Sequence, residues 1–146
     1  MIVEMNSEQE TLSFGRRIGE MLRGGEVIEL VGDMGAGKTT LTKGIALGLG
    51  ITEDIQSPTF TISRVYDTPA QLRLFHYDFY RLNDPGIMQL ELQESITDPS
   101  AITIIEWAGI VQAALPDNRL RITFTAPSEL SRRLELSGHL LEGLMR

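Results

Sequence analysis

The chain has 146 residues, of which 42% are hydrophobic and 23% are charged, a composition that suits one globular domain over residues 1–146. It contains no cysteine, which excludes disulfides and thiolate metal sites. The net charge of -7 argues against direct binding of a polyanion, which normally requires a basic face, so any work on RNA would need a partner that holds the RNA.

The first predicted element is a helix. Ser7 and Glu10 form a capping-box pattern at its start, and Gly24 and Gly25 end it. The segment MIVEMNSEQE (1–10) lacks a basic region followed by an apolar stretch, so we expect no signal peptide. No uninterrupted apolar run approaches the ~18 residues of a membrane span. We therefore expect a cytoplasmic protein that makes no contact with a membrane.

Strands and helices then alternate along the chain. VIELV (27–31) predicts a short strand and KTTLTKGIALGLG (38–50) predicts a helix. AITIIE (101–106) is apolar up to its final acid, which is typical of a central strand buried on both faces. The other expected elements are a helix at 84–96 and two strand pairs, 59–66 with 72–80 and 119–126 with 132–138. This order predicts a single-domain α/β fold with a mixed, mainly parallel β-sheet flanked by helices.

A glycine-rich loop separates the first predicted strand from the second predicted helix. Its residues, GDMGAGKT (32–39), satisfy the pattern G-x-x-x-x-G-K-[ST] in the strand–loop–helix context that the motif requires. Glycines allow positive φ, which turns successive backbone N–H groups toward one point, and the helix N-terminus favours an anion there. Lys38 would reach the β- and γ-phosphates of a nucleotide, and the Thr39 hydroxyl would ligate Mg²⁺. The alternative is a glycine-rich turn that carries a surface lysine. The motif and its context predict a P-loop NTPase-like fold.

Two carboxylates are further candidates for the site. A nucleotide site needs an acid that a neighbouring strand places beside the loop, and Glu106 ends the predicted buried strand. Glu106 would otherwise be an ordinary polar residue at a strand end, and Trp107 would be either a core aromatic or a contact near the phosphates. Asp78 lies in the aromatic run FHYDFYR (75–81), where burial is costly unless the acid is paired or serves a polar site. It would orient the attacking water or a Mg²⁺-bound water, or else pair with Arg81 or a nearby tyrosine hydroxyl.

These motifs resemble the TsaE family, also known as YjeE, the small bacterial ATPase of tRNA threonylcarbamoyladenosine biosynthesis. The segments that carry the resemblance, in order, are GDMGAGKTT (32–40), SPTF (57–60), FHYDFYR (75–81) and IIEWAG (104–109). The resemblance covers nearly the whole chain, from Thr11 to SRRLELSG (131–138). One departure is Ser131, where the family often has glycine.

The resemblance implies a role for each matching residue. The phosphates of ATP would be bound by the loop residues Gly35, Ala36, Gly37, Lys38, Thr39 and Thr40. Mg²⁺ would be held by Thr39 and Glu106. The residues expected to serve hydrolysis are Lys38, Asp78, Glu106 and Trp107. Thr59 matches a switch-like segment that responds to the γ-phosphate, and Thr11 and Ser131 match positions near the nucleoside.

The resemblance also implies the partners TsaD and TsaB. TsaD transfers the threonylcarbamoyl group to the adenosine beside the anticodon, and TsaE proteins bind the TsaB–TsaD dimer. The ATPase cycle would reset this complex between turnovers. The tRNA would then be contacted only indirectly, which suits an acidic protein.

Two other classes of function stay open from the sequence. A free-standing small kinase could use the same loop, but its closing lid would usually carry several arginines, whereas Arg64, Arg73 and Arg81 are scattered through predicted strands. A regulatory module could bind nucleotide without hydrolysing it. No [NT]-K-x-D signature for guanine is present, and the resemblance favours adenine.

Overall fold

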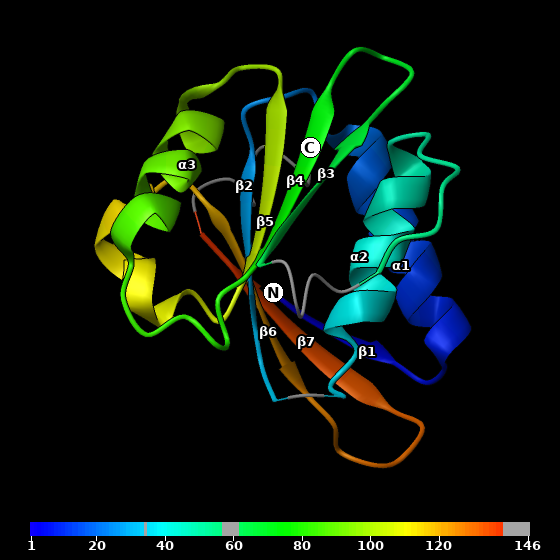
Figure 1. The fold of residues 1–146 in the computed structure, drawn as a ribbon. Coiled ribbons are helices and arrows are strands. Elements are labelled where there is room, and N and C mark those ends of the chain that lie inside the picture. The colour runs from blue at the N-terminus through cyan, green and yellow to red at the C-terminus, as the bar shows by residue number, and fades with distance from the viewer. Residues whose placement is uncertain (34, 57–61, 139–146) are drawn as a thin grey trace.

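A twisted β-sheet carries helices on both of its faces (Figure 1). The computed structural model describes residues 1–33, 35–56 and 62–138. The strands are β1 (Ile2–Met5), β2 (Val27–Val31), β3 (Ser63–Asp67), β4 (Arg73–Asp78), β5 (Ala101–Glu106), β6 (Leu120–Thr125) and β7 (Arg132–Ser137). The helices are α1 (Glu8–Met21), α2 (Lys38–Gly48), α3 (Gly86–Thr97) and the 3-10 helix η1 (Ala108–Ala114). Helices α1 and α2 cover one face, and α3 and η1 cover the other (Figure 1).

The strand order is β1-β7-β6-β2-β5-β4-β3. The central strands β6, β2, β5 and β4 pair in parallel, while β1, β7 and β3 join the sheet through antiparallel pairs. This mixed sheet with flanking helices confirms the predicted fold class. Because the carboxyl ends of parallel strands meet at one edge, the residues that follow β2, β4 and β5 come together there.

Apolar side chains on both faces of the central strands form the core. Every residue of β5 is buried, as predicted for AITIIE. Ile102 and Ile104 join the cluster beneath α1 and α2, whereas Ile105 joins the cluster beneath α3 and η1. Glu106, the last residue of β5, lies on the α1–α2 face because side chains alternate along a strand.

Helices α1 and α2 pack with their backbones in contact. Gly15 and Gly19 of α1 face Gly44 and Gly48 of α2. A Cβ atom at Gly19 would overlap the carbonyl oxygen of Ile45, at a distance of 2.2 Å, so only glycine fits at this position. This glycine interlock (Gly15, Gly19, Gly44 and Gly48) fixes α2 against α1. It therefore also fixes the N-terminus of α2, where the glycine-rich loop ends.

Several elements differ from their predicted form. Strand β1 was not predicted, because its four residues have no clear alternation and its partner β7 lies at the far end of the chain. The 3-10 helix η1 was not predicted either. Strand β4 ends at Asp78 because the chain turns there, with the Tyr80 N–H donating to the Asp78 carboxylate at 3.0 Å. Within the described ranges, no helix combines the length and apolar character needed to cross a bilayer.

Candidate functional site

The glycine-rich loop connects β2 to α2 at the edge where the parallel strands end. Gly32, Gly35 and Gly37 have φ angles of 149°, 78° and 103°, in the region that residues with a Cβ rarely adopt. Helix α2 begins at Lys38, directly after Gly37. The N–H groups of its first turn have no partner within the helix and carry the positive end of its dipole. Loop and helix together therefore form a site for an anion such as phosphate.

A cleft of about 430 Å³ runs along this loop. The structure brings together in its lining these sequence-predicted residues: Thr11, Gly35, Gly37, Lys38, Thr39, Thr40, Asp78, Glu106 and Trp107. Ala36 is buried within the loop, and Ser131 lies in the β6–β7 turn outside the lining. Thr59, with the SPTF segment, lies outside the described residues.

Lys38 lies at the floor of the cleft and is only 5% exposed. Its Nζ donates to the carbonyl oxygen of Gly32 at 2.6 Å and lies 4.3 Å from the centre of the Trp107 ring. Oε1 of Glu106 is 3.8 Å from Nζ, an ion pair longer than a hydrogen bond. The ammonium group is thus shared among a carbonyl, an aromatic face and a carboxylate.

The buried carboxylate of Glu106 has a second partner, which sequence reasoning did not select. Oε2 of Glu106 lies 2.6 Å from Nε2 of His76, whose side chain is fully buried in β4. The sequence did offer one signal for His76. Side chains alternate along a strand, so His76 lies on the same face of β4 as Asp78. The pairing of β4 with β5 then places Asp78 beside Glu106.

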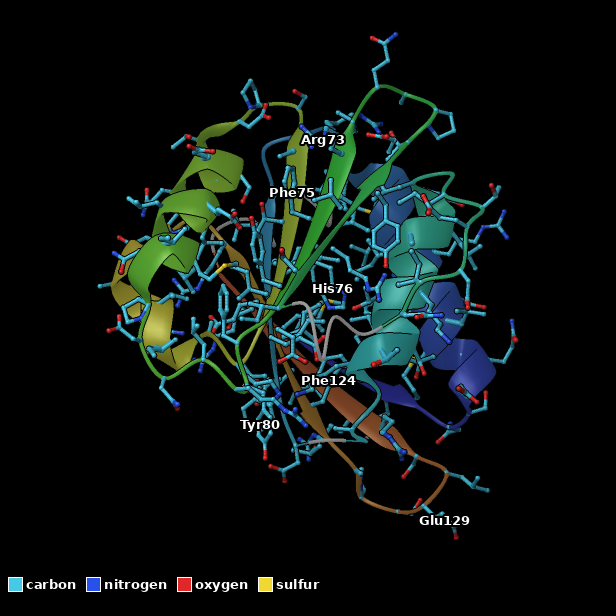
Figure 2. All side chains as sticks on the ribbon, in the orientation of Figure 1. Arg73, Phe75, His76, Tyr80, Phe124 and Glu129 are labelled. Atoms are coloured by element: carbon cyan, nitrogen blue, oxygen red, sulfur yellow. The ribbon has the colours of Figure 1, made fainter. Side chains whose placement is uncertain are left out.

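Asp78 is the last residue of β4 and Trp107 directly follows β5, and both line the cleft. Asp78 is half-buried, and its Oδ1 accepts the N–H of Tyr80. Trp107 adopts a left-handed backbone conformation (φ 56°), and its half-buried ring contacts the Tyr80 ring at a centroid distance of 4.9 Å. Trp107 is therefore a cleft residue rather than a purely internal aromatic. Figure 2 shows Tyr80 at the same end of the molecule as Glu129 of the β6–β7 turn.

Sequence reasoning missed several cleft residues at this end of the sheet, among them Glu129 and Leu130 of the β6–β7 turn and Arg132, the first residue of β7. The Arg132 guanidinium donates to the carbonyl oxygens of Ser128, Glu129 and Ser131, and to that of Gly35 at 3.4 Å. Arg132 therefore links this turn to the glycine-rich loop. The Ser131 hydroxyl instead hydrogen-bonds the Ser128 hydroxyl at 2.7 Å.

The three arginines considered for a kinase lid do not line the cleft. Arg73, for example, forms an ion pair with Asp67 at 3.9 Å and lies over the Phe75 ring at 5.0 Å. Across the part of the chain that the structure describes, no three His, Asp or Glu side chains gather as a ready-made metal site. A divalent cation in this cleft would take oxygens from Thr39, Glu106 or Asp78, and would need further oxygens from a ligand or water.

A parallel-centred α/β sheet with a G-x-x-x-x-G-K-[ST] loop between strand and helix defines the P-loop class of proteins. The model of one family, Threonylcarbamoyl adenosine biosynthesis protein TsaE, matches residues 5–134. The chain belongs to the TsaE family. Its role therefore lies in tRNA threonylcarbamoyladenosine biosynthesis.

Curated relatives and a solved structure support this assignment. The tRNA threonylcarbamoyladenosine biosynthesis protein TsaE of Nostoc sp. is 40% identical over 133 residues, covering 89% of this chain and 81% of the relative. The protein of the same name from Bacillus subtilis is 38% identical over 126 residues, covering 86% of this chain and 78% of the relative. The crystal structure of YdiB from Bacillus subtilis superposes with a TM-score of 0.79 at 31% identity, covering 100% of this chain and 94% of that chain.

Proposed function

We propose that this protein is a Mg²⁺-dependent ATPase that acts in the cytoplasm as an accessory component of the TsaB–TsaD complex. In this role it resets the complex between rounds of threonylcarbamoyl transfer to tRNA and contacts the tRNA only through its partners. One observation carries the proposal: the glycine-rich loop, Lys38, Thr39, Asp78 and Glu106 all line one cleft. The net charge of -7 agrees with an indirect contact to RNA.

The residues of the cleft would divide the work as follows. The loop N–H groups and Lys38 would hold the phosphates, while the Thr39 hydroxyl and the Glu106 carboxylate would hold Mg²⁺. The metal ion would neutralise charge that develops on the phosphates. Asp78, half-buried beside Glu106, would orient water for in-line attack. Trp107 would pack against the Lys38 ammonium, as its ring already does at 4.3 Å.

Hydrolysis by the isolated chain should be slow. Arg132, the arginine that lines the described part of the cleft, donates through Nη1 to the carbonyl oxygens of Ser128, Glu129 and Ser131, so this nitrogen is held to its own turn. An arginine or an equivalent group from a partner can raise such a rate 10³–10⁵-fold. We therefore expect the TsaB–TsaD dimer to stimulate hydrolysis.

The binding step is tested by calorimetric titration of ATP into wild type, Lys38→Ala and Lys43→Ala. Lys43 is a matched control, because it is an exposed lysine on the same helix. Loss of a charge-assisted contact costs ~1.5–3 kcal/mol, so Lys38→Ala should bind ATP at least about 10-fold more weakly. Lys43→Ala should bind normally. Equal affinity in the two variants would count against the whole proposal.

The catalytic step is tested by measuring phosphate release with and without the TsaB–TsaD dimer. The proposal requires slow release alone and faster release with the dimer. Rapid turnover by the isolated chain, or a phosphorylated acceptor, would favour a kinase. ATP binding with no hydrolysis under either condition would favour a regulatory module.

A further inference from the structure

The two oxygens of the Glu106 carboxylate have different neighbours. Oε2 lies 2.6 Å from Nε2 of His76, and Oε1 lies 3.8 Å from Nζ of Lys38. The exposed fractions of the three side chains are 0% for His76, 5% for Glu106 and 6% for Lys38. The Glu106 carboxylate therefore connects Lys38, at the floor of the cleft, to the buried imidazole ring of His76.

The sheet holds His76 in place. His76 pairs with Arg64 of β3 on one side and with Ile104 of β5 on the other. Its ring points, like the side chain of Leu74, to the face that α1 and α2 cover, and Figure 2 shows it in the middle of the molecule. A residue fixed on both sides by strand pairing is a stable support for a neighbouring side chain.

The hydrogen-bonding of the ring indicates which nitrogen carries the proton. Nδ1 of His76 is buried and has no hydrogen-bond partner in the part of the chain that the structure describes. A carboxylate oxygen accepts hydrogen bonds and does not donate them, so the 2.6 Å contact has Nε2–H of His76 donating to Oε2 of Glu106. A buried polar ring usually satisfies both nitrogens. Among the described residues, Glu106 is the one hydrogen-bond partner of this ring, and that contact links His76 to the cleft.

We infer that His76 is a positioning residue that holds Oε2 of Glu106 toward the sheet, so that Oε1 alone faces Lys38 and the cleft. This inference rests on the proposed function, in which Glu106 holds Mg²⁺ and Lys38 holds phosphate. Without His76, Glu106 could turn both oxygens to Lys38 and form a close buried ion pair. Such a pair is costly to separate. It would withhold Glu106 from the metal and Lys38 from the phosphates.

The test compares His76→Leu, which removes the donor at similar size, with His76→Gln, whose amide N–H can replace Nε2–H. Calorimetry gives the dissociation constant of ATP with Mg²⁺ and with a chelator, and the chelator value divided by the Mg²⁺ value measures the metal's contribution. Loss of an outer hydrogen-bond partner typically lowers metal affinity 10–100-fold. We therefore expect this ratio to fall about 10-fold or more in His76→Leu and to recover largely in His76→Gln.

A merely structural role would give a different pattern. Both variants would then unfold at lower temperature while the ratio stayed at the wild-type value, and this result would overturn the inference. If wild type itself showed no effect of Mg²⁺ on ATP binding, the proposed metal site would fail and the inference would fail with it. An unchanged ratio in folded His76→Leu, with a clear Mg²⁺ effect in wild type, would overturn the inference alone.

A second measurement needs no variant at His76. The chain has 2 histidines, so ¹⁵N-histidine labelling gives two sets of ring signals, which His139→Asn would assign. We expect the His76 ring to carry its proton on Nε2, with slow exchange, both before and after addition of Mg²⁺ and a non-hydrolysable ATP analogue. A proton on Nδ1 instead, or loss of the protected Nε2–H once metal and nucleotide are added, would overturn the inference.

Discussion

The glycine interlock between α1 and α2 makes a strong prediction about stability. In Gly19→Ala the new Cβ would lie 2.2 Å from the carbonyl oxygen of Ile45 and 3.0 Å from the Cα of Gly48. Both neighbours are backbone atoms, so no side-chain rotation can relieve the overlap. Restoring an ordinary contact of 3.4 Å requires the two helices to separate by about 1 Å.

The expected loss in the free energy of unfolding is the difference between two opposing contributions. Overpacking a close contact costs about 1–3 kcal/mol, and a contact with backbone on both sides belongs at the upper end of this range. Alanine has a higher helix propensity than glycine, and this difference offsets about 1 kcal/mol of the loss. The free energy of unfolding should therefore fall by about 2 kcal/mol. For a domain of this length, that corresponds to a fall of about 8 °C in the thermal midpoint.

The assay is thermal unfolding of wild type, Gly19→Ala and Gly109→Ala, followed by circular dichroism. Gly109 is the matched control, because a Cβ added there meets nothing within 4 Å. Its substitution should change the free energy of unfolding by no more than about 0.5 kcal/mol. If the midpoint of Gly19→Ala stayed within about 2 °C of the control, the interlock would not be the close backbone contact described above.

Three further changes test the cleft and the turn between α3 and β5. Asp78→Asn should leave ATP binding intact and lower partner-stimulated hydrolysis 10²–10⁴-fold; a lower thermal midpoint with normal turnover would remove Asp78 from the catalytic residues. Thr39→Ala should weaken ATP binding in Mg²⁺ but not in chelator, as titrations under both conditions would show. The Ser100 N–H and hydroxyl lower the pKa of Asp98, so its carboxylate stabilises the fold above about pH 4 and loses this effect as the pH falls through the lowered pKa. The thermal midpoint of Asp98→Ala should accordingly lie below that of wild type at pH 7, with a smaller difference near pH 3; an equal difference at both would contradict this account.

Local patterns predicted much of the fold. The strand–loop–helix around Lys38 and the buried strand that ends at Glu106 can each be predicted from a few consecutive residues. Strand β1 was missed because its stability comes from β7, more than a hundred residues away, as in the hydrogen bond from the Leu136 N–H to the Met1 carbonyl. Such pairing leaves no local signal in a four-residue strand.

The candidate site was predictable to the extent that its residues lie in recognisable motifs. Lys38, Asp78 and Glu106 were selected one motif at a time, and the sheet register then placed Asp78 beside Glu106. The contact of His76 with Glu106 depends on that same register, which the sequence does not state. Arg132 was missed for a similar reason, since its contact with Gly35 joins segments 97 positions apart.

The cleft combines a fixed floor with an exposed rim, and this difference bears on how a partner would control hydrolysis. Lys38 and Glu106 at the floor are almost fully buried and held by the sheet, the loop and the interlocked helices. Leu130 and Tyr80 at the rim are 76% and 52% exposed, although both line the cleft. Large exposed apolar groups beside a polar cleft are suited to contact with another protein. A partner that covered these residues would exclude bulk water from the mouth of the cleft and would bring its own charged groups beside the phosphates without displacing the floor. Under the proposed function, a partner would therefore act on the exposed rim of the cleft and leave the buried floor in place.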